Sequence, residues 1–156
     1  MERENVIKIL KYYSDIDGHI VFARSVLEEY EDKYYGLHSG NPLEGIPSKS
    51  NKISNPTESA VLNIPDSASQ KMNDLRAEIE LLGKLQTAIL TEIGKLPLLE
   101  KNILTYFYFN NFKWVQIAKR VNYSETQCKK IRNKALDKLG VLFDQNELIK
   151  NFNYPN

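Results

Sequence analysis

Apolar residues recur at alternating intervals of three and four along the first 35 residues of the chain. They stand at Val6, Ile9, Tyr13, Ile16, Ile20, Ala23, Leu27, Tyr30 and Tyr34. A heptad stripe of this length predicts a long helix over residues 1–35, whose apolar seam must be buried against another helix.

A second stripe of the same spacing predicts its partner over residues 67–95. Its members are Ala68, Met72, Leu75, Ile79, Leu82, Gln86, Ile89 and Ile93. The two seams indicate an antiparallel helical hairpin, although pairing between two chains would bury the same residues.

Between the two stripes, over residues 36–66, glycine and proline interrupt a segment rich in Ser and Asn. The interruptions are Gly36, Gly40, Pro42, Gly45, Pro47, Pro56 and Pro65. We expect a connector there without a long helix or strand, because such breakers recur too closely for either. A connector of this length is unusual in a compact domain.

Few residue types for catalysis or metal binding are available. The single cysteine, Cys128, cannot form an internal disulfide, and with only His19 and His38 it cannot complete a zinc cluster. We expect both histidines to be solvated or packed. The chain shows no glycine-rich phosphate loop, no catalytic triad, no signal peptide and no apolar run long enough to span a bilayer. These features predict a cytoplasmic protein that is not an enzyme, binds no cofactor or metal and does not enter a membrane.

Residues 96–140 have the pattern of three short helices. The first is expected over residues 98–109 with Leu99, Ile103, Tyr106 and Phe107 buried, followed by a turn at Asn110 and Asn111. The second contains Trp114, Ile117, Ala118 and Val121. After a turn at Asn122 and Tyr123, Ser124 should cap a third helix that runs from Glu125 to about Leu139 and stops at Gly140. Its buried face would hold Cys128, Ile131, Ala135, Leu136 and Leu139, and the aromatic residues Phe107, Phe109, Phe112 and Trp114 are expected in the core. Residues 141–156 would be a tail. The fold class is therefore all-α.

Charge is distributed unevenly along the chain. The whole chain has 21 basic and 20 acidic residues, a net charge of +1. Residues 110–140 contain eight basic and two acidic side chains, a net charge of +6, whereas residues 1–35 contain five and eight, a net charge of −3. A positive field confined to one short segment is typical of proteins that bind polyanions.

Two short helices joined by a tight turn, the second basic and polar, are the arrangement of a helix-turn-helix whose second helix enters the major groove. The residues expected to read base edges are Glu125, Thr126, Gln127, Lys129, Lys130 and Asn133. The residues expected to contact phosphates are Lys113, Lys119, Arg120, Ser124, Arg132 and Lys134. Double-stranded DNA is therefore the predicted partner.

Several stretches of this region resemble the carboxyl-terminal promoter-reading domain, region four, of bacterial sigma factors. They are Leu96–Lys101, Trp114–Ala118, Tyr123–Ile131 and Lys134–Leu139. With the upstream motif Asn55-Pro56-Thr57-Glu58 and the long amphipathic helix, the chain resembles the RinA/ArpU group of sigma-like regulators from phages of Gram-positive bacteria. This resemblance implies an activator of late phage genes that acts with host RNA polymerase, and it assigns promoter reading to Glu125, Thr126, Lys129 and Lys130.

The chain departs from the sigma pattern at three positions of the predicted helix-turn-helix. Lys113 stands where Ser or Thr usually caps the second helix, Gln116 replaces a usual Glu, and Asn122 replaces a common Gly. Asn is a mild change because it also accepts a positive φ. The domain with which sigma factors melt promoter DNA has no counterpart in 156 residues. We therefore expect an auxiliary activator, dimeric through its heptad helices.

Two other functions fit the same pattern. A phage DNA-packaging protein of the small terminase type also joins a helix-turn-helix to helical oligomerisation elements. A module that binds polymerase or a sigma factor could present the same basic helix without contacting DNA.

Overall fold

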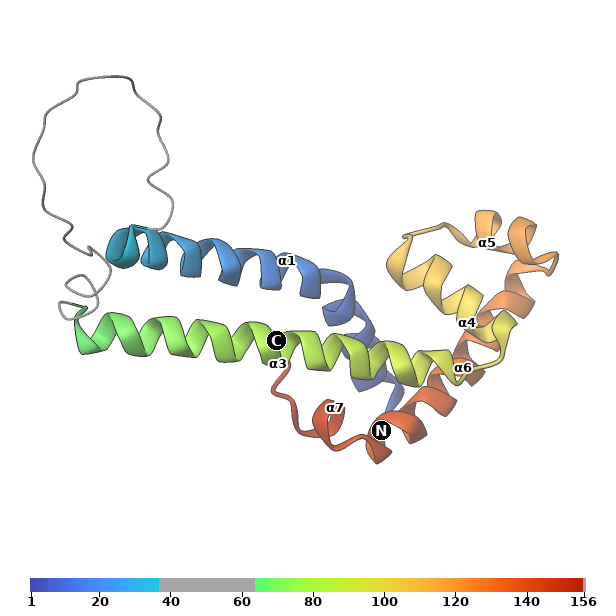
Figure 1. Ribbon diagram of the computed structural model, residues 1–156. Helices are drawn as coiled ribbons and strands as arrows, with labels where there is room; N and C mark the ends of the chain where they lie inside the picture. The colour runs from blue at the N-terminus through green and yellow to red at the C-terminus, as the bar shows by residue number, and fades with distance from the viewer. Residues whose placement is uncertain (37–63, 156) are drawn as a thin grey trace, which may run out of the picture. The chain divides into compact units, whose positions relative to one another are not determined.

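The structure is a computed structural model that describes residues 1–36 and 64–155 (Figure 1). Its helices are α1 (Arg3–Tyr35), α3 (Asp66–Gly94), α4 (Leu98–Leu104), the π-helical turn η1 (Thr105–Phe109), α5 (Trp114–Val121), α6 (Glu125–Gln145) and α7 (Glu147–Asn151). The described residues contain no strand, so the all-α prediction is confirmed. The expectations for residues 37–63, including those for His38 and the Asn55–Glu58 motif, lie outside the described residues.

The chain forms two compact units. One combines residues 1–19 with residues 81–156, and the other consists of residues 20–80. Helices α1 and α3 each contribute a segment to both units. Helices α4, α5, α6 and α7 lie wholly within the first unit.

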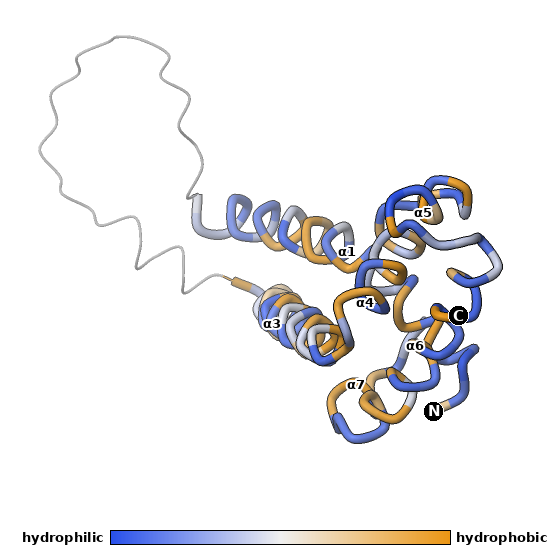
Figure 2. Tube along the Cα trace, turned by 90° about the vertical axis from the view of Figure 1, so that its right-hand side faces the viewer, coloured by the Kyte–Doolittle hydropathy of each residue, from blue (hydrophilic) through white to orange (hydrophobic). Residues whose placement is uncertain are grey.

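In each unit the seam residues of α1 and α3 are buried or half-buried, and Leu10 and Leu85, which lie beside the seams, are fully buried as well. In the first unit Val6, Ile9 and Ile16 are buried along with Ile89 and Ile93, and Asp17 accepts a 2.7 Å hydrogen bond from Gln86. Figure 2 shows hydrophobic positions alternating with hydrophilic ones along both helices.

In the second unit Ala23, Met72 and Leu75 are buried, and Arg76 forms a 2.7 Å ion pair with Glu31. Both contacts follow the antiparallel pairing that the two stripes predicted. The seams are thus covered within one chain. Val21 and Phe22, which lie outside the seam, are 65% and 70% exposed.

A three-helix unit made of α4, α5 and α6 contains its own small core. Each of the three helices contacts the other two. The fully buried centre consists of Ile103, Ile117 and Cys128, one from each helix. Partly buried residues pack around it: Leu99, Tyr106, Phe107, Phe112, Trp114, Ala118, Val121 and Ile131. The predicted core role of the aromatic residues in this list is confirmed.

The first of the three predicted helices is not α-helical throughout. After Leu104 the backbone widens into η1, where the N–H of Asn110 donates to the carbonyl of Thr105, five residues back, at 3.0 Å. The prediction of one continuous helix over residues 98–109 missed this change, because the apolar spacing continues through Phe109 without a break.

The packing of three aromatic side chains explains why the backbone forms a π-turn at η1. Tyr106, Phe107 and Phe109 pack against different partners. Tyr106 stacks on Phe112 with ring centroids 5.6 Å apart, and Phe107 stacks on Trp114 at 4.4 Å. Phe109 packs against Tyr13 of α1 at 4.9 Å. A regular α-helix would place the first and last of these rings on nearly the same face.

The prediction that the third helix stops at Gly140 is wrong. Helix α6 continues to Gln145, with Gly140 buried inside it. Glycine at this position instead allows the backbone of Met1 to lie close to α6, because a Cβ here would lie 2.5 Å from the carbonyl oxygen of Met1. The backbone at the start of α1 therefore packs directly on α6.

The prediction of a tail over residues 141–156 is also wrong. Phe143 and Ile149 are fully buried, and the Tyr154 hydroxyl donates to the carbonyl of Ile149 at 3.1 Å. Helix α7 starts after Asn146, whose side chain accepts from the N–H of Ile149. The last residues are thus part of the first unit. Among the described helices, none combines the length and the apolar character needed to cross a membrane.

Candidate nucleic-acid interface

The turn between α5 and α6 has the chemistry that the sequence predicted. Asn122 adopts φ 57° and ψ 42°, the left-handed conformation that ends α5. The N–H of Tyr123 donates back to the carbonyl of Ala118 at 3.2 Å. Ser124 then caps α6, because its Oγ accepts from the N–H of Gln127 at 3.1 Å. The two helices are therefore joined by only three residues.

Replacing Asn122 tests this turn. Asn122→Ala is expected to lower the free energy of unfolding by about 1 kcal/mol, because alanine reaches the left-handed region at a higher cost than asparagine. Asn122→Gly should be neutral or stabilising, since glycine accepts this conformation freely. Urea unfolding followed by circular dichroism measures both changes. Equal destabilisation by the two variants would show that the Asn122 side chain, and not its backbone conformation, matters.

The start of α5 explains how the chain tolerates Lys113 in place of a capping Ser or Thr. The N–H of Lys113 donates to Oε1 of Gln116 at 2.8 Å. This is one half of a capping box, with the glutamine doing what a glutamate does elsewhere. Gln116 therefore keeps the half of the capping box that a Glu would make, while the Lys113 side chain makes no cap hydrogen bond.

The predicted base-reading residues lie together on the first half of α6. Glu125, Thr126, Gln127, Lys129 and Lys130 are exposed, and Asn133 is half-buried. The outermost stripe contains Thr126, Lys130 and Asn133, four and three residues apart. Lys129 lies on a flank of the helix, with Nζ 5.8 Å from the ring centroid of Trp114.

The predicted phosphate contacts divide into two groups. Lys113, Lys119 and Arg120 on α5 and Lys134 on α6 are exposed. The guanidinium of Arg120 lies 4.7 Å from the ring centroid of Phe112, which fixes its direction.

The other two predicted phosphate contacts are engaged in the fold itself. The Ser124 hydroxyl caps α6, as described above. Arg132 is half-buried, with its Cζ 5.4 Å from the ring centroids of both Phe107 and Trp114. Burial raises the pKa of the neighbouring Tyr108 phenol, and the Arg132 guanidinium partly offsets this effect.

Two charged residues at the end of the basic segment are neutralised by partners outside it. Lys138 forms a 2.7 Å ion pair with Glu100 of α4. Arg3 of α1 donates to Asp137 at 2.6 Å, and this guanidinium lowers the pKa of the Asp137 carboxyl. Neither pair has a sequence signature, because its partners lie on different helices.

Seven cations of residues 110–140 remain without a carboxylate partner in the part of the chain that the structure describes. They are Lys113, Lys119, Arg120, Lys129, Lys130, Arg132 and Lys134. They all belong to α5, α6 or the residue before α5. The charge of the six exposed cations is therefore available to a polyanion, whereas Arg132 is half-buried against Phe107 and Trp114.

Trp114, predicted to be a core residue, also contacts the basic side chains of α6. Its ring stacks on Phe107 and borders two cations of α6, Lys129 and Arg132. It holds the flank of the basic helix in place. No spacing rule connects a residue in α5 with two residues in α6, so only the tertiary structure reveals this contact.

Cys128 lies at the centre of the three-helix core. It is fully buried, and burial raises the pKa of its thiol. We expect Cys128 to react with a disulfide reagent at pH 8 only as fast as the unit opens, because both thiolate formation and access are suppressed. Absorbance of the released thiolate, measured with and without urea, tests this. Rapid stoichiometric reaction of the folded protein would contradict it.

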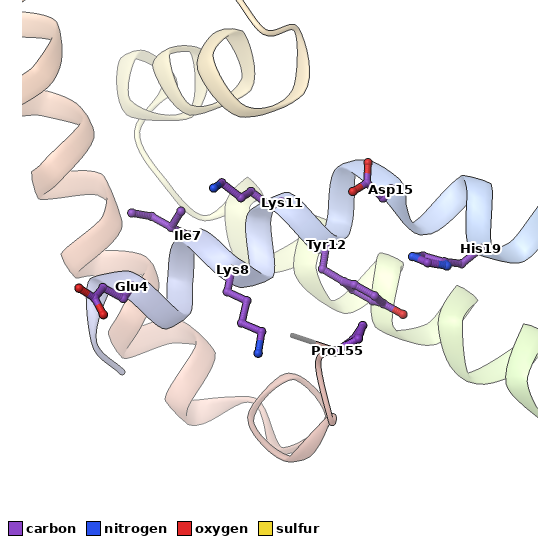
Figure 3. Close-up of a pocket in the computed structure, with 8 residues that line it drawn as sticks. All are labelled: Glu4, Ile7, Lys8, Lys11, Tyr12, Asp15, His19 and Pro155. Atoms are coloured by element: carbon purple, nitrogen blue, oxygen red, sulfur yellow. The ribbon is translucent and has the colours of Figure 1, made fainter.

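No group of three or more His, Cys, Asp or Glu side chains suited to a metal ion occurs among the described residues. A groove of about 540 Å³ lies on α1 beside Pro155 (Figure 3). Glu4 and Asp15 line it together with Lys8 and Lys11, and the two lysines point to different sides of α1. His19 stacks on Tyr12 there, with ring centroids 5.3 Å apart. The mixed charge distinguishes this groove from the cationic surface of α5 and α6.

These observations define an all-α protein with a helix-turn-helix unit whose outer surface is cationic. The chain belongs to the family described as "Protein of unknown function (DUF722)", whose model matches residues 32–141. This range includes every residue predicted to contact DNA. No curated protein and no solved structure matches the chain.

Proposed function

We propose that this protein binds double-stranded DNA in a sequence-specific manner, with the first half of α6 in the major groove. The cluster of six exposed cations without carboxylate partners among the described residues, on α5, α6 and the residue before α5, is the observation that carries the proposal. Exposed Thr126, Gln127 and Lys130 supply donors and acceptors that can distinguish base pairs. Lys119 and Arg120 would fix the position of the unit on the phosphate backbone.

We further propose that the protein is a sigma-like auxiliary activator of late phage genes, acting with host RNA polymerase in the bacterial cytoplasm. The resemblance of residues 96–139 to the promoter-reading sigma domain supports this role. The left-handed Asn122, the Ser124 cap and the hydrogen bond from Lys113 N–H to Gln116 support it as well, because they form a short turn between two helices, as a helix-turn-helix requires.

Selection of bound sequences from a random DNA pool tests DNA binding and specificity together. We expect one enriched motif, which should also appear as a footprint upstream of a single promoter of the source phage genome. Lys129→Glu should abolish the footprint, whereas Lys71→Glu, the same charge change on an exposed residue of α3, should leave it intact. A pool without any enriched sequence would contradict the proposal.

An apolar groove supports a protein contact in addition to DNA binding. Leu96, Pro97, Val141 and Leu142 line a groove of about 390 Å³, with Lys95 and Lys138 at its sides. Neighbouring Leu98 is 68% exposed, and Val141, which lines the groove, is 59% exposed. This surface suits both an activator that contacts polymerase and the alternative of a polymerase-binding or sigma-binding module.

The double variant Leu98→Ser with Val141→Ser distinguishes these two functions. An activator should keep its DNA affinity and lose transcription activation. If the protein is an interaction module, the double variant should lose partner binding, and the wild-type protein should not bind DNA. Both activities unchanged would remove the groove from the proposal.

We propose a homodimer as the active form. Because both seams are covered within one chain, the dimer contact would use another surface, for which the exposed Val21 and Phe22 are suited. Mass measurement in solution tests the oligomeric state, and Phe22→Ser should shift a dimer to a monomer. A ring of many subunits would instead support a DNA-packaging protein.

A further inference from the structure

The side chain of Asn133 has a fixed orientation. Its Oδ1 accepts two hydrogen bonds from Arg132, from Nε at 3.2 Å and from Nη2 at 2.8 Å. A guanidinium offers only donors, so the carbonyl side of the Asn133 amide must face it. The amide therefore cannot rotate by half a turn without losing both bonds.

Arg132 is itself held by the core of the three-helix unit. Its guanidinium lies against the stacked rings of Phe107 and Trp114, whose centroids are 4.4 Å apart. Both rings pack on the buried centre around Ile103 and Ile117. The orientation of Asn133 thus follows from contacts that do not involve DNA.

This orientation restricts the chemistry that Asn133 can offer. Both lone pairs of Oδ1 are used by Arg132, whereas the described residues provide no acceptor for the two N–H groups of Nδ2. An unrestricted asparagine reads adenine by donating to N7 and accepting from N6. Asn133 can only donate, and guanine presents two acceptors, N7 and O6, in the major groove.

We propose that Asn133 is a donor-only reader that selects guanine over adenine at one position of the DNA site, with Arg132 as its positioning residue. The inference rests on the proposed DNA-binding function. Arg132 acts here through Asn133 and not as a phosphate contact. Cytosine should be the least accepted base at this position, because it presents only a donor there.

Selection from a random DNA pool with matched variants tests this specificity. Asn133→Ala should lose the preference at one position and keep the rest of the motif, which identifies the position. At that position the wild-type protein should favour guanine over adenine by about tenfold. Arg132→Met should shift the preference toward adenine, because Oδ1 of Asn133 becomes free to accept.

Lys134→Met is the control, since it removes the same charge from the next exposed residue without touching the Arg132–Asn133 pair. It should weaken binding and leave the guanine preference unchanged. Replacing the guanine at the identified position by 7-deazaguanine should weaken wild-type binding by about tenfold, a result that does not depend on the folding of any variant.

The possible results separate the two proposals. A wild-type preference for adenine at the Asn133-dependent position, or a motif that Asn133→Ala leaves unchanged at every position, overturns the inference while DNA binding stands. An unenriched wild-type pool contradicts the proposed function itself.

Discussion

Phe143→Ala is expected to lower the free energy of unfolding by about 3–5 kcal/mol. The Phe143 side chain is the largest of those that are fully buried in the described residues. It lies in the part of α6 that extends beyond Gly140. Removing the ring would leave a cavity that the surrounding helices can fill only in part, so the transfer and cavity costs add.

Urea unfolding followed by circular dichroism measures this loss. Val141→Ala, two residues earlier on an exposed face, is the matched control and should change stability by less than about 0.5 kcal/mol. A chain truncated after residue 140 should be destabilised at least as strongly as Phe143→Ala, because it also removes Ile149. Full stability of the truncated chain would mean that residues 141–156 are a tail after all.

Reversing two charges on α6 is expected to weaken DNA binding on the order of 100-fold at low salt. Lys130→Glu with Lys134→Glu suits this test because both side chains are exposed and lie four residues apart. The double variant exchanges one pair of like charges for another on the same helix face, so the effect on helix stability should be small. The loss of affinity comes from the missing base contact of Lys130, the missing phosphate attraction of Lys134 and two new repulsions.

Fluorescence anisotropy with a labelled duplex over a range of salt concentrations measures the change. The slope of log affinity against log salt should fall by about one in magnitude, for the lost phosphate contact of Lys134. Arg24→Glu with Lys71→Glu is the control, because it makes the same change of net charge at two exposed positions of the second unit, residues 20–80. This control variant should keep nearly wild-type affinity for DNA. Equal losses from both double variants would indicate attraction by net charge alone, without a binding surface on α6.

Local signals allowed much of the fold to be predicted from the sequence. The two heptad stripes predicted α1 and α3 to within two residues at each end, because helical burial repeats with the period of the helix. Asn122 and Ser124 predicted the turn before α6, because positive φ and capping depend on the residue itself and its nearest neighbours.

Local patterns were misleading where a distant segment supplied the deciding contact. Gly140 has the sequence signature of a helix stop, yet the backbone of Met1 occupies the space that its missing side chain leaves. The aromatic residues of η1 have one apolar period, yet they pack toward α1, the loop before α5 and α5 itself, in a π-helical turn.

The candidate site shows the same division. Its exposed cations were predicted, because a basic and polar helix face is visible in the order of residues. The orientation of Asn133, the position of Arg132 on Trp114 and Phe107, and the neutralisation of Asp137 by Arg3 were not. The last two require side chains from different elements to meet, and the first depends on them, because the Arg132 that orients Asn133 is held by Phe107 and Trp114.

The sequence by itself determined the all-α class, the two heptad seams and the cationic helix, since periodicity, capping and charge are properties of neighbouring residues. Only the tertiary structure decided where α6 ends, which cations remain without a carboxylate partner and which way Asn133 faces. The physical reason is that these features depend on packing between residues such as Arg3 and Asp137, whose separation along the chain leaves no periodic trace.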